Sequence, residues 1–482
     1  MREKARGLAA RASTVESLFV ATFTLLGLRL GLRRLGDNSL FLHLRTGIDM
    51  VRTGSIPRVD PYSFTARGRP WVVQSWLPEA TYGIAHRLGG FTAVRLEHGA
   101  LYALLAWLIG RRARTGSPVR TAVAVALALG LGVVYWSPRP LAFGLVAFAV
   151  TVTIVEERRP PWLLVPVVWI WVNSHGSFPL GVAWLVLVAL GQWLDSRGQS
   201  LTRRPPVLPW LFAFLIGLVT SMLNPLGPRL LVFPLTVLDK REAFRHVVEW
   251  RPLDVGSATG LFTLAFLAGV VLVVVLTRRR LAWSDVLPAG VLVLLGLLAQ
   301  RNLPVAAVAV APVLGRALQA RPGVDSPATT GGTGPLQLVL AGSLAVLALL
   351  FTGGILREPP LELQGYPVRA LELAGAQVPL GRLVTDDVAA GYVILVHGQR
   401  AGVFIDDRVD LYPVRVTLDY LRLVQGQSQA LDILDRHGAE VVVWEAKRPL
   451  VRRMEDSGGW RRVGTRDGWA VLVRATAPAP GP

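Results

Sequence analysis

The most reactive side chains of this sequence lie in six polar or Pro-Arg segments that interrupt long apolar runs. The carboxylate of Asp37, which follows the first apolar run, could act as a general base toward an acceptor hydroxyl. Asp60, before Pro61, is the second candidate base. Each aspartate also has a structural interpretation, because aspartate often caps the start of a helix and Asp-Pro often begins a turn. The six segments are 37–95, 137–140, 171–176, 224–227, 249–252 and 300–302.

Cationic and amide side chains in these segments could bind a phosphate group. Arg139 stands between two prolines and Arg301 stands beside Asn302, and a guanidinium can form paired hydrogen bonds with phosphate oxygens. At the end of a membrane helix the same arginines could instead reach toward lipid headgroups. The other candidate binding residues are His43, Arg45, Glu97, His98, Asn173 and His175.

Each of these other candidates has a structural alternative. His43 flanks the apolar side of an expected helix and could pack there, and Asn173 and His175 could belong to a turn. Glu97 and His98 fall inside an apolar run, where an ionisable side chain is either functional or hydrogen-bonded to a neighbouring helix. The many arginines of the first long segment, which include Arg45, need an explanation, and an anionic ligand is one.

The sequence indicates neither a metal site nor a cofactor. Its 7 histidines never stand at a spacing that would place two of them on one face of a helix as metal ligands. It has 0 cysteines, which excludes disulfides, thiolate metal sites and a cysteine nucleophile. A divalent metal held by carboxylates would be compatible with the sequence, but no motif calls for one.

The elements that must position these residues are membrane-spanning helices. The chain has 482 residues, of which 52% are hydrophobic and 17% charged, and the apolar residues come in long continuous runs. About eleven helices are expected, which makes a polytopic α-helical membrane protein. The expected spans are 15–33, 92–110, 119–136, 141–156, 161–175, 177–194, 206–223, 257–277, 282–299, 303–319 and 335–356.

Basic residues give the expected orientation of these helices. Clusters such as 111–114, 158–159 and 278–280 lie in alternate short connections, on the side of the N-terminus, which is therefore predicted to be cytoplasmic. All six reactive segments then lie outside. The formal charge of +19 is mostly explained by this topology, and no nucleic-acid-binding motif is present. The short cytoplasmic connections leave no room for a nucleotide-binding domain.

Outside the membrane two parts are long enough to fold. The transmembrane domain is predicted over 1–356 and includes a long first loop at about 37–91, with an amphipathic helix starting near Leu40 on the outer membrane surface and a second helix over 74–88. Trp71 and Trp76 are expected as interfacial aromatics. A small extracytoplasmic α/β domain is predicted over 357–476, followed by a disordered tail at 477–482. Its expected elements are strands at 380–385, 402–405, 440–444 and 468–474 and a helix at 429–437.

Taken together, the segments resemble a bacterial group of multi-spanning proteins with a GT-C-type glycosyltransferase architecture. In that group the first outer loop reads approximately Asp-x-Asp-Leu-Trp-Trp-His-Leu-x-Thr-Gly, then Gly-x-Ile-Pro-x-x-Asp-Pro-Phe-Ser-Phe-Thr. The matching residues here are Asp37, Leu40, His43, Leu44, Thr46 and Gly47, then Gly54, Ile56, Pro57, Asp60, Pro61, Ser63, Phe64 and Thr65. The resemblance continues through Arg139-Pro140, Asn173-x-His175-Gly176, Asn224-Pro225, Glu249-Trp250, Arg301-Asn302 and Phe404-Ile405-Asp406-x-Arg408-x-Asp410-x-Tyr412. The chain departs from the pattern at Ser39 and at Phe41-Leu42, so it has one carboxylate where the pattern has two.

The resemblance implies a GT-C-like fold and transfer of a sugar from a polyprenyl-phosphate donor to an acceptor on the outer face, with the aspartate after the first helix as base. The acceptor would be a cell-envelope glycan, lipid or protein, and the location would be the bacterial plasma membrane. Two other functions stay open. One is a binding or assembly protein that kept the fold without catalysis, and the other is a transporter or flippase of lipid-linked sugars. If the protein is a glycosyltransferase, six of these residues are predicted to approach one another around an outer cavity. They are Asp37, His43, Asp60, Arg139, His175 and Arg301.

Overall fold

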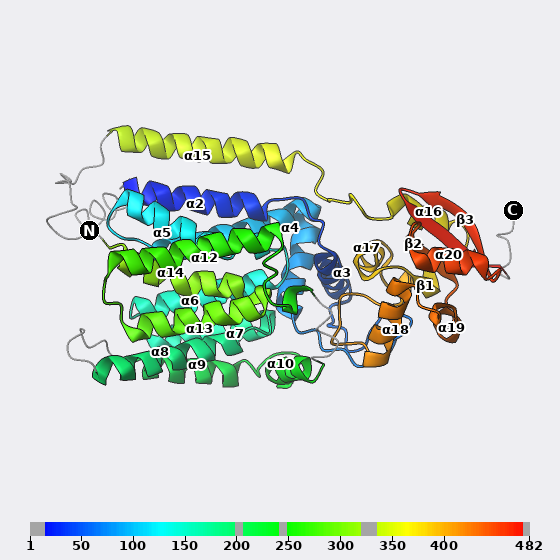
Figure 1. Cartoon of the computed structure of the whole chain (residues 1–482), viewed down its shortest axis with the longest axis horizontal. Helices are drawn as coiled ribbons and strands as arrows, with labels where there is room; N and C mark the ends of the chain where they lie inside the picture. The colour runs from blue at the N-terminus through cyan, green and yellow to red at the C-terminus, as the bar shows by residue number, and fades with distance from the viewer. Residues whose placement is uncertain (1–14, 198–205, 241–247, 320–334, 476–482) are drawn as a thin grey trace. The chain divides into compact units, whose positions relative to one another are not determined.

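The computed structural model describes residues 15–197, 206–240, 248–319 and 335–475. These residues form two compact units (Figure 1). Unit 1 comprises Met1–Arg34, Thr92–Leu231 and Val247–Pro360, and unit 2 comprises Leu35–Phe91, Val232–His246 and Leu361–Pro482. The first long segment, which was predicted to be part of the transmembrane domain, thus groups with the tail in unit 2. The tail expected to be disordered, 477–482, lies outside the described residues.

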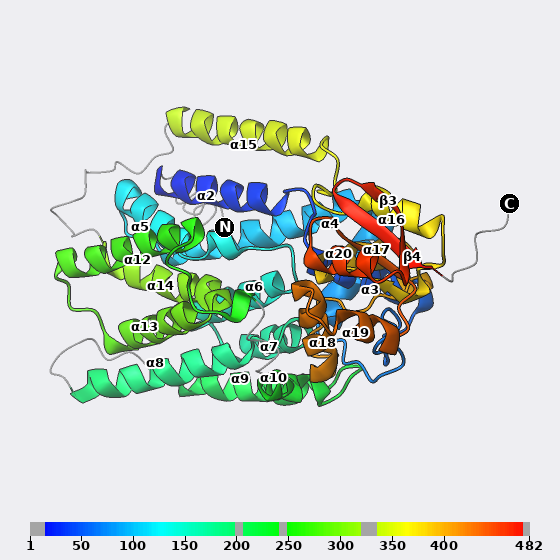
Figure 2. The same ribbon diagram turned by 45° about the vertical axis from the view of Figure 1, so that its right-hand side comes forward.

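Unit 1 is a bundle of apolar helices joined by short turns. Its helices are α2 (Val15–Gly31), the second half of α4 (Trp76–Arg112), α5 (Pro118–Gly130), α6 (Leu141–Glu156), α7 (Leu164–Ser174), α8 (Pro179–Arg197), α9 (Leu208–Thr220), α12 (Ala258–Thr277), α13 (Trp283–Leu298), α14 (Leu303–Ala317) and α15 (Pro335–Leu356). Short 3-10 turns η1 (Val133–Tyr135), η2 (Pro161–Leu163), η3 (Val248–Trp250) and η4 (Gln300–Asn302) connect some of them, and α10 (Arg229–Asp239) crosses into unit 2. Helix α13 lies between α8 and α14 (Figures 1 and 2).

Each span expected from the sequence coincides with a helix, because each is a continuous apolar run. Within the described residues, four helical segments are long and apolar enough to cross a membrane, namely Pro118–Tyr135, Pro179–Arg197, Ala258–Thr277 and Val339–Leu356. Others, such as α6 and α7, are apolar but shorter. The structure therefore has the helical fold of a membrane protein, and the number of about eleven crossings stays a prediction.

Two glycines bring α2 against α4. A Cβ added to Gly27 would lie 2.4 Å from the carbonyl oxygen of Tyr102, and a Cβ added to Gly31 would lie 2.4 Å from that of His98. The two glycines are four residues apart, so they share one face of α2. Small residues at this spacing allow close helix packing in membrane proteins. His98 is thereby fixed at a helix crossing.

Arg95 links α4 to the carboxyl ends of α2 and α15. Its side chain is fully buried, and its guanidinium donates to the carbonyl oxygens of Leu32 (2.9 Å), Ile355 (3.0 Å) and Glu358 (3.2 Å). Carbonyls at helix ends lack partners within the helix, and a cation also complements the helix dipole there. One side chain thus caps two helices.

Replacing Arg95 by methionine is expected to lower the free energy of unfolding by about 3 kcal/mol or more, because hydrogen bonds to a charged donor each contribute about 1.5 to 3 kcal/mol. The measurement is thermal melting of the purified protein in detergent. Arg87→Met is the control for loss of an arginine charge, since Arg87 is exposed on the first half of α4, before the kink at Gly89-Gly90. Equal melting temperatures of the two variants would contradict this role.

Unit 2 contains a four-stranded mixed sheet in the order β1-β2-β4-β3, of which Figure 2 labels β3 and β4. Strand β1 (Leu383–Val384) is parallel to β2 (Val441–Glu445), and β4 (Trp469–Arg474) is antiparallel to both β2 and β3 (Trp460–Arg466). Its helices are α3 (Asn38–Thr53), the first half of α4, α16 (Val368–Gly375), α17 (Asp387–His397), α18 (Val414–Gln425), α19 (Ala430–Arg436) and α20 (Pro449–Asp456). The 3-10 turns η5 (Leu380–Arg382) and η6 (Gly398–Arg400) complete it.

The predicted elements of the tail are only partly formed. The expected helix at 429–437 and the strands at 440–444 and 468–474 are present as α19, β2 and β4. The strand expected over 402–405 is wrong, because Val403 makes only isolated bridges to Ser63 and Leu383. This buried run has the composition of a strand, but its backbone bonds are divided between two partners. Strand β3 was not predicted.

Helix α3 forms where its apolar spacing predicts, but its buried face has a protein partner. Helix α3 packs against α17, which follows more than 300 residues later in the chain. The residues from Ser39 to Leu42 are all buried, and the Phe41 ring lies 5.4 Å from that of Tyr366. The apolar face of α3 is therefore covered by protein, and a position of this helix on the outer membrane surface stays a prediction. Trp71 is likewise buried in the core of this unit and is not an interfacial aromatic.

Asp386 gives unit 2 a pH-dependent stability. It is the N-cap of α17, and its Oδ1 accepts a hydrogen bond from Ala389 N at 2.6 Å. Burial, together with the nearby carboxylates of Asp387 and Glu445, raises the pKa of Asp386 to about 6. The folded state therefore binds a proton that the unfolded state has released, so this contribution to stability falls as pH rises from about 4 to about 6.

Asp386→Asn keeps a capping side chain and cannot ionise, so the variant is expected to melt several degrees above the wild type at pH 7.5. The gain should disappear at pH 4, where the wild-type carboxyl is protonated in both states. Thermal melting of the full chain at the two pH values measures the difference. A gain of equal size at both pH values would exclude ionisation of Asp386 as the cause.

Candidate functional site

Asp37 is the N-cap of α3 in unit 2. Its backbone is extended, with φ −93° and ψ 123°, and its Oδ1 accepts a hydrogen bond from Leu40 N at 3.0 Å. The side chain is half-buried. The capping interpretation of Asp37 is thus observed. The Asp37 side chain can cap the helix and also act as a general base, because a carboxylate has two oxygens with several lone pairs.

His43 faces a carboxylate across the α3–α4 contact. Its Nδ1 lies 2.6 Å from Oε1 of Glu79, whose side chain is 2% exposed. Two glycines make this approach possible, since a Cβ on Gly47 would lie 1.8 Å from Glu79 O and one on Gly83 would lie 2.2 Å from Gly47 O. A carboxylate at this distance favours the proton on Nδ1 and holds the ring in one orientation. Nε2 has no partner in the described part of the chain.

Arg45 is engaged within unit 2. Its guanidinium binds both carboxylate oxygens of Asp49 at 3.1 and 3.2 Å and donates to the carbonyl oxygen of Leu395 at 3.3 Å. Asp49 also accepts from the Tyr62 hydroxyl at 3.1 Å and pairs with Arg52. Burial and the nearby Asp49 carboxylate raise the pKa of Tyr62, which keeps its hydroxyl protonated as a donor. These contacts account for Arg45 without the anionic ligand that the sequence suggested.

Asp60 lies in a buried ion cluster. Its carboxylate accepts from the backbone N–H groups of Tyr62 (3.0 Å) and Ser63 (3.1 Å), as expected for the start of an Asp-Pro turn. It also pairs with Arg408 Nη2 at 2.7 Å, and Arg408 in turn binds Asp406 through Nε at 2.9 Å. The structural interpretation of Asp60 is therefore observed, and a carboxylate with these partners is poorly placed to serve as a base.

Three of the reactive segments converge in unit 1. Arg139 Nη1 donates to Oε1 of Glu249 at 2.6 Å, and the Arg301 guanidinium lies 4.3 Å above the ring of Trp250. Gln300 Nε2 donates to the carbonyl oxygen of Val248 at 2.7 Å. Turn η3 therefore lies between the two arginines and joins them to one cluster. The ion pair between Arg139 and Glu249 was not predicted from the sequence.

The segment after α7 forms a compact turn. Asn173 is buried and its Nδ2 donates to Trp169 O at 2.7 Å, while Nδ1 of His175 accepts from Ser177 N at 3.2 Å. Helix α6, which begins directly after Arg139 and Pro140, packs here, because a Cβ on its Gly144 would lie 2.8 Å from Ser177 Oγ. The segments 137–140 and 171–176 are thus neighbours through the first turn of α6.

Glu97 and His98 are on α4. His98 is fully buried, and its Nδ1 lies 2.9 Å from the carbonyl oxygen of Val94 one turn earlier. The predicted site residues thus divide between the units. Asp37, His43, Arg45 and Asp60 belong to unit 2, and Glu97, His98, Arg139, Asn173, His175 and Arg301 belong to unit 1. Their common cavity stays a prediction.

Glu79 and Glu249 are the most informative residues that were not predicted as site residues. Glu249 lies in one of the six reactive segments. As an acidic residue in a set of segments that also contains Arg139 and Arg301, it could have been predicted to form an ion pair with one of these arginines. Glu79 had no such signal, because it stands in the first turn of a helix, where acidic residues are common.

The fold is shared with solved structures. ArnT from Cupriavidus metallidurans bound to undecaprenyl phosphate matches with a TM-score of 0.51 and 14% sequence identity, over 96% of this chain and 98% of that chain. The apo state of the same protein matches with a TM-score of 0.50 and 15% identity, over 94% and 97%. The apo oligosaccharyltransferase of Archaeoglobus fulgidus matches with a TM-score of 0.49 and 12% identity, over 88% and 69%. No protein-family model matches the sequence, and no curated protein sequence matches it. The likeness to ArnT confirms the GT-C-type fold that the sequence resemblance implied.

Proposed function

We propose that the protein is a membrane glycosyltransferase that moves a sugar from a polyprenyl-phosphate-linked donor to an acceptor on the extracytoplasmic face. The observation that carries the proposal is the likeness to ArnT over nearly the whole of both chains, because that protein was solved with undecaprenyl phosphate bound. The acceptor would belong to the cell envelope, in the plasma membrane of a bacterium. The N-terminus would be cytoplasmic, as the basic connections predict.

In the proposed reaction Asp37 takes the proton of an acceptor hydroxyl. The hydroxyl oxygen attacks the anomeric carbon of the donor and forms the new glycosidic bond. The bond between the anomeric carbon and the phosphate oxygen breaks, and its electron pair leaves with the polyprenyl phosphate. The position of Asp37 supports this role, since a half-buried carboxylate at a helix start is held in place by the backbone while keeping contact with solvent.

Arg139 and Arg301 would bind the phosphate of the donor. Stacking on Trp250 uses the face of the Arg301 guanidinium, and the N–H groups around its edge are the ones that bind phosphate oxygens. Glu249 holds Arg139 and would orient it. These arginines would stabilise the charge that develops on the leaving phosphate.

His43 would bind the donor or acceptor through Nε2, and Glu79 would be its positioning residue. Glu79→Gln and His43→Gln are each expected to lower kcat/KM about tenfold or more. The double variant should lose little more than the stronger single variant, because the two side chains act as one unit. Melting temperatures serve as the folding control. Additive losses would show that the pair does not act together.

The direct test is release of polyprenyl phosphate by the purified protein in lipid nanodiscs. A synthetic polyprenyl-phosphate sugar is added with a mixture of envelope acceptors, and both the free polyprenyl phosphate and the labelled acceptor are measured. A transferase yields the two products in equal amounts. A binding protein would retain the donor intact. In a separate assay with the protein in sealed vesicles, a flippase would move the donor across the membrane without cleaving it. Either of those results would overturn the proposal.

A further inference from the structure

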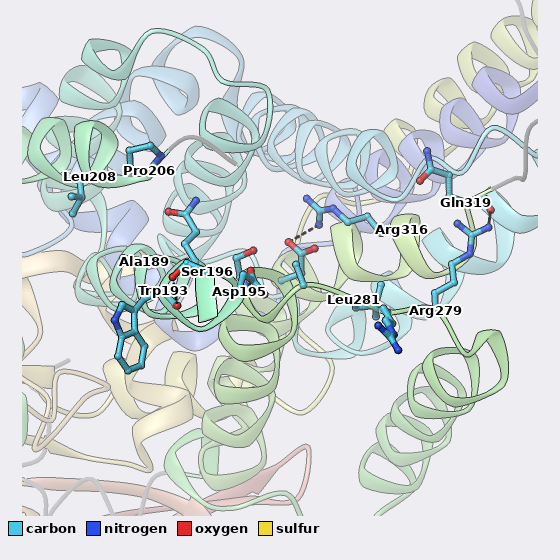
Figure 3. Close-up of a pocket in the computed structure, with 15 residues that line it drawn as sticks. Ala189, Trp193, Asp195, Ser196, Pro206, Leu208, Arg279, Leu281, Arg316 and Gln319 are labelled. Atoms are coloured by element: carbon cyan, nitrogen blue, oxygen red, sulfur yellow. Dashed lines mark hydrogen bonds and ion pairs between the residues drawn. The ribbon is translucent and has the colours of Figure 1, made fainter. Parts of the chain in front are cut away.

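Unit 1 has two adjoining cavities at the end where the basic connections gather. The first, of about 590 Å³, is lined by residues at the end of α8, the start of α13 and the end of α14 (Figure 3). The second, of about 520 Å³, lies beside the ends of α4, α6 and α14, and the two share Arg316 and Gln319. Neither is lined by a proposed site residue.

These cavities lie at the opposite end of the helices from the reactive segments. Helix α13 begins at the first cavity and ends before η4, which carries Arg301. Its 16 residues span about 24 Å at 1.5 Å per residue. Helix α14 runs the other way, from η4 to Arg316 near its last turn. The cavities are therefore separate from the proposed site for sugar transfer.

The acidic groups of the first cavity are already neutralised or used as caps. The carboxylate of Asp195 accepts from the backbone N–H groups of Trp283 (2.7 Å) and Ser284 (3.1 Å) and so caps α13. Asp285 pairs with Arg316 at 3.2 Å, and Glu156 of the second cavity also pairs with Arg316. The positive charges of Arg279 and Arg280 are left without a carboxylate among the described residues.

Two donor side chains in the first cavity are suited to an anionic ligand. Arg280 is exposed and has no hydrogen-bond or ion-pair partner within the described ranges. The hydroxyl of Ser284 is buried, lines the cavity and has no hydrogen-bond partner there either. A buried hydroxyl without a partner is costly, and a phosphate oxygen would accept from it.

An exposed apolar surface leads away from the mouth of the cavity. On α8, Val186, Leu190 and Trp193 are exposed at helical spacing, and on the adjoining α9 Leu208 and Phe212 are exposed. Trp193 and Leu208 also line the cavity, and Figure 3 shows them on the side away from Arg279 and Arg316. Tryptophan is typical of the boundary between lipid headgroups and acyl chains. A ligand with a phosphate and a long apolar part fits both surfaces.

We propose that this cavity binds the phosphate-bearing headgroup of an anionic phospholipid, whose acyl chains lie along α8 and α9. Arg279, Arg280 and Ser284 would bind the phosphate oxygens. Basic pockets between membrane helices are known to bind anionic lipid headgroups. The site would tie the protein to anionic lipid independently of sugar transfer.

The test compares lipid binding by native mass spectrometry of the delipidated full chain. Wild type is expected to bind one phosphatidylglycerol at least tenfold more tightly than phosphatidylcholine. Arg279→Gln/Arg280→Gln should remove this preference. The matched control is Arg158→Gln/Arg278→Gln, which removes two charges from exposed residues that line neither cavity, and it should keep the preference within threefold. Equal losses in both double variants would overturn the proposal, since they would indicate charge attraction without a site.

A second arm separates lipid from free phosphate. Trp193→Ala is expected to weaken phosphatidylglycerol binding while leaving any binding of inorganic phosphate unchanged, because the indole would contact only the apolar part of the ligand. Inorganic phosphate at millimolar concentration should not displace the lipid from wild type. If it does displace the lipid, and Trp193→Ala binds the lipid as wild type does, the cavity is a site for soluble phosphate and the lipid proposal is wrong. Melting temperatures of all variants verify folding.

Discussion

Asp37→Asn is expected to abolish sugar transfer while leaving the melting temperature nearly unchanged. A general base contributes a factor of about 10² to 10⁴ in rate, whereas a helix cap contributes about 0.5 to 2 kcal/mol of stability. Asparagine caps as well as aspartate, so it should accept the hydrogen bond from Leu40 N. It cannot take a proton from the acceptor. The two roles of Asp37 therefore separate in one substitution, measured as transfer rate and as melting temperature.

The chain offers a matched control for this experiment. Asp386 caps α17 in the same way as Asp37 caps α3, with a hydrogen bond from the backbone N–H three residues later. Asp386→Asn should transfer sugar at the wild-type rate. Ser39→Ala should also retain activity. Ser39 stands at the position of the second aspartate in the GT-C family motif, but it has no carboxylate to contribute. Transfer by Asp37→Asn near the wild-type rate would leave Asp37 as a cap and would favour a non-catalytic protein.

Arg408→Met is expected to destabilise unit 2 by about 3 to 5 kcal/mol, because it leaves two buried carboxylates without their cation. Asp60 and Asp406 are both nearly inaccessible to solvent, and Arg408 is the cation that bridges them. The guanidinium also lies 4.4 Å above the ring of Trp71, so methionine loses a stacking contact as well. The measurement is the melting temperature and the yield of folded protein.

Arg415→Met serves as the control for Arg408→Met, since Arg415 is exposed on α18 of the same unit. The triple variant with Asp60→Asn and Asp406→Asn added should recover part of the lost stability, because it removes the uncompensated charges. If the triple variant is less stable than Arg408→Met alone, the cost arises from lost packing and hydrogen bonds, and unpaired charge is not its cause.

The helices of unit 1 were predictable because each is a continuous apolar run, but the partners in unit 2 were not. Leu40 and Leu44 mark the buried face of α3, yet nothing local indicates that this face packs against α17. Strand β3 was missed because it contains three exposed arginines, two of them adjacent, and few apolar residues. The Asp467-Gly468 turn that joins it to β4, with positive φ at both residues, was the signal that could have found it.

For the candidate site, residue types were predictable and partners were not. A guanidinium at Arg139 is suited to phosphate, but its ion pair with Glu249 joins segments 110 residues apart. From the sequence, Asp60 and Asp37 were equivalent candidates for the base, because each also had a structural interpretation. Asp37 could cap a helix, and Asp60 could begin an Asp-Pro turn. Only the position of Arg408, which approaches Asp60 from the tail, distinguishes a buried structural carboxylate from a half-exposed one.

The division of unit 2 into three separate stretches of sequence has a consequence during synthesis on the ribosome. Roughly 270 residues separate Phe91 from Leu361, and at about 5 to 20 residues per second their translation takes on the order of 15 to 55 s. During that time Phe41 lacks the rings of Tyr366 and Tyr392 that cover it in the finished fold. The newly made first stretch is therefore without these protein partners for that interval, which is when a chaperone or the bilayer surface would have to cover Phe41.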